Sequence, residues 1–276
     1  MKQVLLLFAV LLSIPGTAQR LVLRAGLGHA LPLSNSRPVY LTGFPYTGGS
    51  KNPSDNAMFE VKKASMFSGT RAVAAVGFMF PRIGFEIAAA TVISAVEYKV
   101  ATSLGDVYPA GSETHIRQSI TNPTLLLPSA VMNIPGKKLD VSVRAGLALP
   151  LHARMQVESE TFSNGNRFYD RSELRSSFGF GLAFSGGVEY KITSKLRAGL
   201  ALDIITMTLK AKQLTLKESS ANGESTFPDK LAYEKQTLYV DDMSSYTFSS
   251  DAPRQAPGYS IPFGTKGLSL TISMIL

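Results

Sequence analysis

The strictest regularity of the sequence is the alternation of apolar and non-apolar residues from Lys138 to Glu158. Every odd-numbered position in this segment is apolar, and every even-numbered position is charged, polar, small or proline. Successive side chains of a β-strand point to opposite faces, so a period of two predicts a strand and contradicts a helix. Strands of soluble proteins usually cover about five or six residues, whereas a strand that crosses a bilayer needs ~9–11 residues. The length of the segment therefore favours a membrane-crossing strand.

The same alternation recurs and predicts eight strands in all. Its clear repeats lie at Arg20–Leu31, Ser177–Ile192, Leu196–Ala211 and Gly267–Leu276. The alternation changes phase at Ile204-Ile205, which predicts a β-bulge there. Weaker strands are predicted near residues 62–80, 83–99 and 116–134.

The face opposite the apolar residues consists largely of Gly, Ala and Ser, and only 17% of the whole chain is charged. A solvated sheet would carry more charge, whereas small residues suit the crowded interior of an eight-stranded barrel. The connections alternate in length, as they do in outer-membrane barrels. Short turns lie at 81–82, 135–138 and 193–195, and long polar segments lie near 32–60, 100–115, 159–173 and 217–258.

These features predict an all-β fold, a closed antiparallel transmembrane β-barrel of eight strands with short periplasmic turns and long extracellular loops. Two alternatives stay open. A barrel of ten strands results if Lys230–Ser249 adds a hairpin. A soluble barrel or sandwich would show the same period, because alternation alone does not tell which face is wet.

Residues 1–18 are predicted to be a cleaved signal peptide, and residues 19–276 the barrel domain. Lys2 gives a basic start, Val4–Ile14 an apolar core, and Gly16-Thr17-Ala18 the small residues before a cleavage site. The apolar core is too short to cross ~30 Å of hydrocarbon as a helix. The chain has no Cys, which excludes disulfides, thiolate chemistry and a lipoprotein anchor.

A short pattern, Leu or Val followed by Arg-Ala-Gly-Leu, occurs three times, with its arginine at Arg24, Arg144 and Arg197. By parity with the apolar face, each of these arginines points into the lumen. The same parity adds one arginine and four acids, and charges in a closed interior are expected to pair. The predicted lumen charge network is Arg24, Arg71, Glu86, Asp140, Arg144, Glu189, Arg197 and Asp203. A charge-lined ion path is the alternative interpretation.

The signal, the repeated Arg-Ala-Gly-Leu strand openings and the alternating C-terminal strand resemble the small, eight-stranded outer-membrane β-barrel proteins abundant in Bacteroidetes. The resemblance covers the whole chain after the signal, and its motifs are architectural. It implies a location in the cell outer membrane and insertion by the barrel-assembly machinery, which recognises the last strand. In many outer-membrane proteins that strand ends in Phe or Trp, whereas this one ends in Leu276.

The expected partners are outer-membrane lipid and lipopolysaccharide. Four basic residues predicted near the outer strand ends could contact lipopolysaccharide phosphates, namely Arg117, Arg154, Lys210 and Lys212. A scattered solvated rim is the alternative. The net charge of +8 does not predict a nucleic-acid partner, because an exported protein does not routinely meet nucleic acid. No extracellular ligand is indicated.

The sequence selects no catalytic or metal-binding constellation, although His152 with Ser112 or Ser163 and Glu158 could supply a nucleophile, a base and an acid. Its three histidines, His29, His115 and His152, have no partners at metal-ligand spacing. We therefore expect no metal, no cofactor and no enzymatic activity. The predicted function is a structural or surface-interaction barrel with a closed, salt-bridged lumen. The alternatives are a narrow, porin-like channel for small solutes and, less favoured, a rim enzyme that modifies lipids or peptides.

Overall fold

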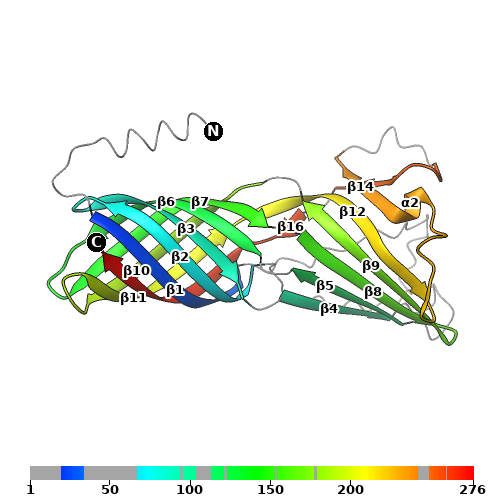
Figure 1. Cartoon of the computed structure of the whole chain (residues 1–276), viewed down its shortest axis with the longest axis horizontal. Helices are drawn as coiled ribbons and strands as arrows, with labels where there is room; N and C mark the ends of the chain where they lie inside the picture. The colour runs from blue at the N-terminus through cyan, green and yellow to red at the C-terminus, as the bar shows by residue number, and fades with distance from the viewer. Residues whose placement is uncertain are drawn as a thin grey trace, which may run out of the picture.

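The computed structural model of the chain describes residues 20–33, 67–93, 96–103, 113–120, 123–152, 154–176, 179–241, 249–258 and 260–276. These residues form two sheets, a closed barrel and a second sheet that continues from one end of it (Figure 1). The described residues contain no helix long and apolar enough to cross a membrane. The predicted signal peptide at 1–18 lies outside the described residues.

The barrel closes through eight antiparallel strands in the order β1-β17-β11-β10-β7-β6-β3-β2. Strand β1 pairs with β2 on one side and with β17 on the other, so the first and last strands of the barrel join. The predicted all-β fold and closed eight-stranded barrel are confirmed. The barrel strands are β1 (Arg20–Pro32), β2 (Gly69–Met79), β3 (Ile83–Val92), β6 (Thr124–Ile134), β7 (Leu139–His152), β10 (Gly181–Lys191), β11 (Leu196–Thr206) and β17 (Thr265–Ile275).

One end of the barrel, which we call the short-turn end, carries the three predicted short connections. The Phe80 amide donates to the Ile83 carbonyl at 2.8 Å, and the Ile192 amide donates to the Leu196 carbonyl at 3.0 Å. The third turn runs from Ile134 to Leu139. Arg20 and Leu276 lie at this end as well, because Arg20 pairs with Met79 and the Leu276 amide donates to the Leu21 carbonyl.

The second sheet, which we call the extension, projects from the opposite end of the barrel (Figure 1). Its strand order is β15-β14-β12-β9-β8-β5-β4, and β13 and β16 pair in addition with β12. Its elements are β4 (Val96–Ser103), β5 (Glu113–Ile120), β8 (Arg154–Ser163), β9 (Asn166–Ser176), β12 (Thr208–Ala221), β13 (Glu224–Ser225), α2 (Ala232–Lys235), β14 (Gln236–Val240), β15 (Arg254–Pro257) and β16 (Ser260–Pro262).

The extension corrects several predictions about strands and loops. The segment Lys138–Glu158 is not one strand, because it is shared between β7 and β8. The predicted loop at 159–173 is the hairpin of β8 and β9, and the predicted loop at 217–258 contains α2, β14 and β15. The ten-stranded alternative is wrong, since β14 pairs with β12 and β15 in the extension and not within the barrel. Most of the predicted loops at 32–60 and 100–115 lies outside the described residues.

The predicted bulge at Ile204-Ile205 is also wrong. Strand β11 keeps its register with both β10 and β17 through these residues. What changes there is the environment: Ile204 is exposed on the outer face, whereas Ile205 is buried in the core at the barrel end. The phase shift in the sequence therefore marks the point where apolar side chains move from the outer face to the inner face.

Two tight turns shape the far side of the extension. Asn164-Gly165 and Asn222-Gly223 all have positive φ, between 50° and 89°, which is the geometry of a two-residue hairpin turn that favours Asn-Gly. The Asn222 side chain accepts a hydrogen bond from the Arg167 amide and donates one to the Asn166 side chain, both at 2.8 Å. These bonds tie the β8–β9 hairpin to the β12–β13 hairpin.

Candidate functional site

The structure places all eight charged residues of the predicted network inside the barrel. They come from β1, β2, β3, β7, β10 and β11, at positions that alternate with exposed apolar residues. Five of them are buried, namely Arg71, Glu86, Asp140, Arg144 and Glu189. The side chains of the other three are at most 20% exposed. We therefore take the lumen as the candidate site.

Glu86 is the centre of the ion pairs that cross the lumen. Its carboxylate accepts two hydrogen bonds from Arg24, from Nε at 3.0 Å and from Nη2 at 2.5 Å. Arg144 places its Nε 3.4 Å from the same carboxylate and donates from Nη2 to Glu189 at 3.0 Å. In the sheet order β2 separates β1 from β3, and β6 separates β3 from β7. Both pairs of Glu86 therefore connect strands that are not neighbours, whereas Arg144 and Glu189 lie on the neighbouring strands β7 and β10.

The chain of charges continues to Asp140, which is fully buried. Its carboxylate lies 2.6 Å from Arg197 Nη1 and 2.9 Å from Lys191 Nζ, and it accepts the Gly136 amide at 3.0 Å. Arg197 also lies 4.0 Å from Glu189, which joins the two groups of pairs. Lys191 is not in the predicted network, although it lies two residues after Glu189 and so shares its face.

A third group lies nearer the extension. Arg71 donates to Asp203 at 3.3 Å, and Asp203 also accepts from the Ser269 hydroxyl. The Arg71 guanidinium lies 5.7 Å from the centre of the Phe67 ring, within cation–π range. Strand order separates β2 from β11 by β1 and β17, so this pair crosses the lumen too.

The repeated Arg-Ala-Gly-Leu pattern has a packing explanation at its third copy. Gly199 lies two residues after Arg197 and faces the same side of β11. A Cβ added there would lie 2.8 Å from Thr271 Oγ1 and 3.0 Å from Glu189 Cγ. The arginine thus supplies a lumen charge, and the glycine leaves room for the acid that the charge contacts.

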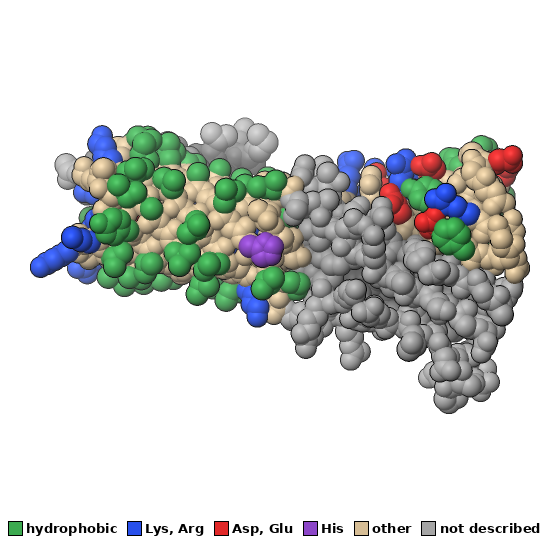
Figure 2. Space-filling model, turned by 90° about the horizontal axis from the view of Figure 1, so that it is seen from below, with side chains coloured by type: hydrophobic (Ala, Val, Ile, Leu, Met, Phe, Trp, Pro, Cys, Tyr) green, Lys and Arg blue, Asp and Glu red, His purple; other side chains and the backbone are tan. Residues whose placement is uncertain are grey.

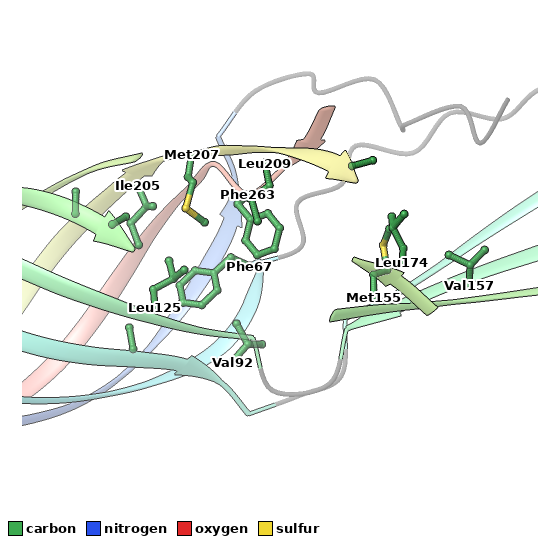
Figure 3. Close-up of a cluster of buried hydrophobic side chains, with 14 residues drawn as sticks. Phe67, Val92, Leu125, Met155, Val157, Leu174, Ile205, Met207, Leu209 and Phe263 are labelled. Atoms are coloured by element: carbon green, nitrogen blue, oxygen red, sulfur yellow. The ribbon is translucent and has the colours of Figure 1, made fainter. Parts of the chain in front are cut away.

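Apolar side chains fill the barrel end that faces the extension. Figure 3 shows Phe67 and Phe263 close to Leu125, with Ile205 and Met207 beside them, and each of these residues is at most 5% exposed. The cluster continues into the extension through Leu209, Met155 and Leu174. The sequence predicts a lumen closed by ion pairs, but it does not predict this apolar layer.

The ion pairs separate two cavities. One, of about 40 Å³, lies between the ion pairs and the apolar layer and is lined by Arg71, Asp203 and Ser269 among others. The other, of about 290 Å³, lies toward the short-turn end and is lined by residues of the turns such as Phe80, Pro81 and Pro135. Apart from the cavity of about 40 Å³, ion pairs and apolar side chains fill the lumen between the short-turn cavity and the extension.

The four predicted lipopolysaccharide contacts lie in the extension and not on barrel strands. Arg154 begins β8, with its exposed side chain 3.8 Å from Glu173. Lys210 and Lys212 are exposed on β12, and Lys210 lies 3.2 Å from Asp241. Arg117 belongs to β5, and its side chain lies outside the described residues. The three described side chains lie on the first residues of β8 and β12 after the barrel.

The three histidines do not provide a candidate metal-binding or catalytic site among the described residues. His29 is exposed on the outer face of β1, and the side chains of His115 and His152 lie outside the described residues. Within the part of the chain that the structure describes, no group of three or more His, Asp or Glu side chains could hold a metal ion.

A surface cluster in the extension gives a prediction for pH. The hydrogen bond from Arg175 holds the pKa of the Glu173 carboxyl below its ordinary value, against partial burial and with help from Lys217 and Arg154. Because the folded-state pKa is the lower one, the cluster stabilises the extension above the unfolded-state pKa, and this stabilisation is lost as pH falls through the folded-state pKa. The basic partners of Glu173 are exposed. We therefore expect the cluster to contribute about 1 kcal/mol or less to the free energy of unfolding.

Amide hydrogen exchange checks this expectation at neutral and at acidic pH. Protection in β8, β9 and β12 should fall on acidification, while protection in the barrel strands changes less. The Glu173→Gln variant should exchange faster in the extension already at neutral pH and lose most of the pH dependence. Equal pH dependence in the two proteins would exclude Glu173 as the titrating group.

No family model and no curated protein matches the chain. The resemblance to small outer-membrane barrels therefore rests on the sequence features and remains a prediction.

Proposed function

We propose that the protein is an integral outer-membrane β-barrel with a closed lumen and a structural or surface-interaction role. The observation that carries this proposal is the composition of the outer face of the barrel. Among the described residues, nearly all exposed large hydrophobic side chains lie on barrel strands or directly beside them (Figure 2). The exceptions are Phe162, Phe168 and Leu231 in the extension.

Charge is almost absent from this outer face. Along the eight barrel strands, the outward positions contain one Lys, Lys266, and one His, His29, and no Asp, Glu or Arg. The two lie close together near the extension, because Leu31 pairs with Lys266 and His29 with Leu268. A soluble barrel of this size would carry interspersed charges over its surface, so the apolar outer face favours lipid as its surroundings.

The lengths of the barrel strands also fit a lipid bilayer. Its strands have 10 to 14 residues, and ~9–11 tilted residues cross the hydrocarbon of a bilayer. Closure leaves no unpaired strand edge in lipid. Exposed basic residues lie at the short-turn end, where an apolar band would meet anionic headgroups; they are Arg20, Arg82, Lys137, Lys138 and Lys195.

In this proposal the short turns face the periplasm and the extension faces the outside of the cell. The extension then offers a sheet to partners in the medium, and Arg154, Lys210 and Lys212 lie where lipopolysaccharide phosphates would be met. The barrel-assembly machinery would recognise β17. The alternation of buried and exposed residues along β17 supports this role, since its outward residues from Leu268 to Met274 are all apolar.

A porin-like channel is the second candidate, and the packing of the lumen argues against it. Conduction needs a continuous wet path, whereas ion pairs and the Phe67, Phe263 and Leu125 side chains fill the lumen. Planar-bilayer recordings of the refolded protein test this point. We expect no stable single-channel steps. Reproducible steps of one size would contradict the closed lumen and favour the channel.

A further inference from the structure

The cavity of about 290 Å³ at the short-turn end is lined by more basic than acidic side chains. We propose that it is a binding site for a small anion with two negative charges, of the phosphate or dicarboxylate class. The cavity lies on the opposite side of the ion pairs from the apolar layer. The inference goes beyond the proposed function and does not depend on the medium around the barrel.

The charge balance around the cavity is the first argument. Four basic side chains line it, Arg20, Arg144, Lys191 and Arg197, against two acids, Glu86 and Glu189. Behind the lining, Arg24 pairs with Glu86, and Asp140 pairs with Lys191 and Arg197. The whole group thus has five cations and three anions. Arg20 is exposed, and the other seven side chains, which are buried or half-buried, comprise four cations and three anions. The lining therefore has a positive balance, which favours an anion beside it.

Unused hydrogen-bond donors are the second argument. The Nε atoms of Arg144 and Arg197 are buried, and neither has a hydrogen-bond partner among the described residues. Arg144 Nε is within ion-pair distance of Glu86 at 3.4 Å, but it is not aligned for a hydrogen bond. A guanidinium matches two oxygens of a carboxylate or phosphate. These two Nε atoms are covered, so an oxyanion in the cavity reaches them only if the Arg144 or Arg197 side chain turns toward it, whereas the exposed guanidinium of Arg20 is open to the cavity directly.

Size and access are the third argument. A volume of about 290 Å³ lies near the lower limit of ligand pockets and corresponds to on the order of ten water molecules. Arg20 lines the cavity and is exposed to solvent, and it has no ion pair within the described part of the chain. It is placed to meet an anion that enters from the short-turn end.

Arg20 also gives a test that leaves the ion pairs intact. The full chain, refolded in a non-ionic detergent, is titrated calorimetrically with inorganic phosphate, with succinate and with chloride at constant ionic strength. We expect phosphate or succinate to bind at one site, and chloride to bind much more weakly. Binding of both dianions would define a general dianion site, and binding of phosphate alone a phosphate site. Absence of binding by both dianions would overturn the proposal.

Variants distinguish binding in this cavity from non-specific attraction of anions to the basic residues at the short-turn end. Arg20→Gln should weaken binding roughly tenfold, because it removes a charge-assisted hydrogen bond to the anion. Arg20→Lys should keep most of the affinity. The matched control is Arg82→Gln, which removes an exposed cation of the same end that does not line the cavity. Equal losses in Arg20→Gln and Arg82→Gln, or no loss in Arg20→Gln, would contradict a site in the cavity.

Discussion

Replacing Glu86 by alanine is expected to lower the free energy of unfolding by about 3–5 kcal/mol, the usual effect of removing one partner of a buried ion pair. The change leaves Arg24 without its two hydrogen bonds and removes the 3.4 Å contact of Arg144. Both arginines remain in a lumen where they have little access to water. Urea titration in detergent micelles, followed by the heat-modifiable migration of the folded barrel on gels, measures the loss.

The control is a carboxylate–cation pair on the surface, formed by a lysine in place of the arginines. Asp241 lies 3.2 Å from Lys210, and both side chains are well exposed. Asp241→Ala should change stability by about 1 kcal/mol or less, because exposed pairs contribute little. If Glu86→Ala and Asp241→Ala lower the free energy of unfolding equally, the ion pairs in the lumen do not stabilise the barrel more than an exposed pair does.

A positive charge on the outer face of the barrel is expected to destabilise the protein in lipid. Leu270 lies in the middle of β17, is 67% exposed and is flanked across the strands by Leu27 and Leu200. If the barrel spans a bilayer, Leu270→Arg should cost about 2–4 kcal/mol, as a basic residue does near the midplane. Unfolding of the protein in lipid vesicles of phosphatidylcholine measures this cost.

Leu231 offers the matched substitution in the extension. It is also an exposed leucine, and it precedes α2 outside the barrel. Leu231→Arg should change the free energy of unfolding by no more than about 0.5 kcal/mol, as most substitutions at exposed positions do. A soluble barrel would tolerate both changes equally, so equal small effects would contradict the proposed lipid contact.

The barrel could be predicted from the sequence because its evidence is local. Parity along single strands assigned Arg24, Glu86 and Arg144 to one side of the sheet, and closure brings that side together in a narrow interior. No knowledge of which strands are neighbours was needed. Lys191, the last residue of β10, is not in the predicted network, although its parity with Glu189 is the same.

The extension could not be predicted by the same rule. Alternation tells which residues share a face, but not what that face contacts. Odd positions from Leu139 to Leu151 are apolar and mostly exposed, whereas Met155 and Val157 continue the pattern and are buried. The sequence therefore shows one strand where the structure has two. The Asn-Gly pairs at 164–165 and 222–223 were the available signal for hairpins within the predicted loops.

The central claim is that the apolar outer face of the barrel lies in a bilayer. The most direct measurement is flotation of the refolded chain with lipid vesicles in a density gradient, after washing at alkaline pH to remove peripheral proteins. We expect the protein to float with the vesicles and to resist the wash. A chain that stays at the bottom of the gradient, folded and monodisperse without lipid or detergent, would contradict the claim.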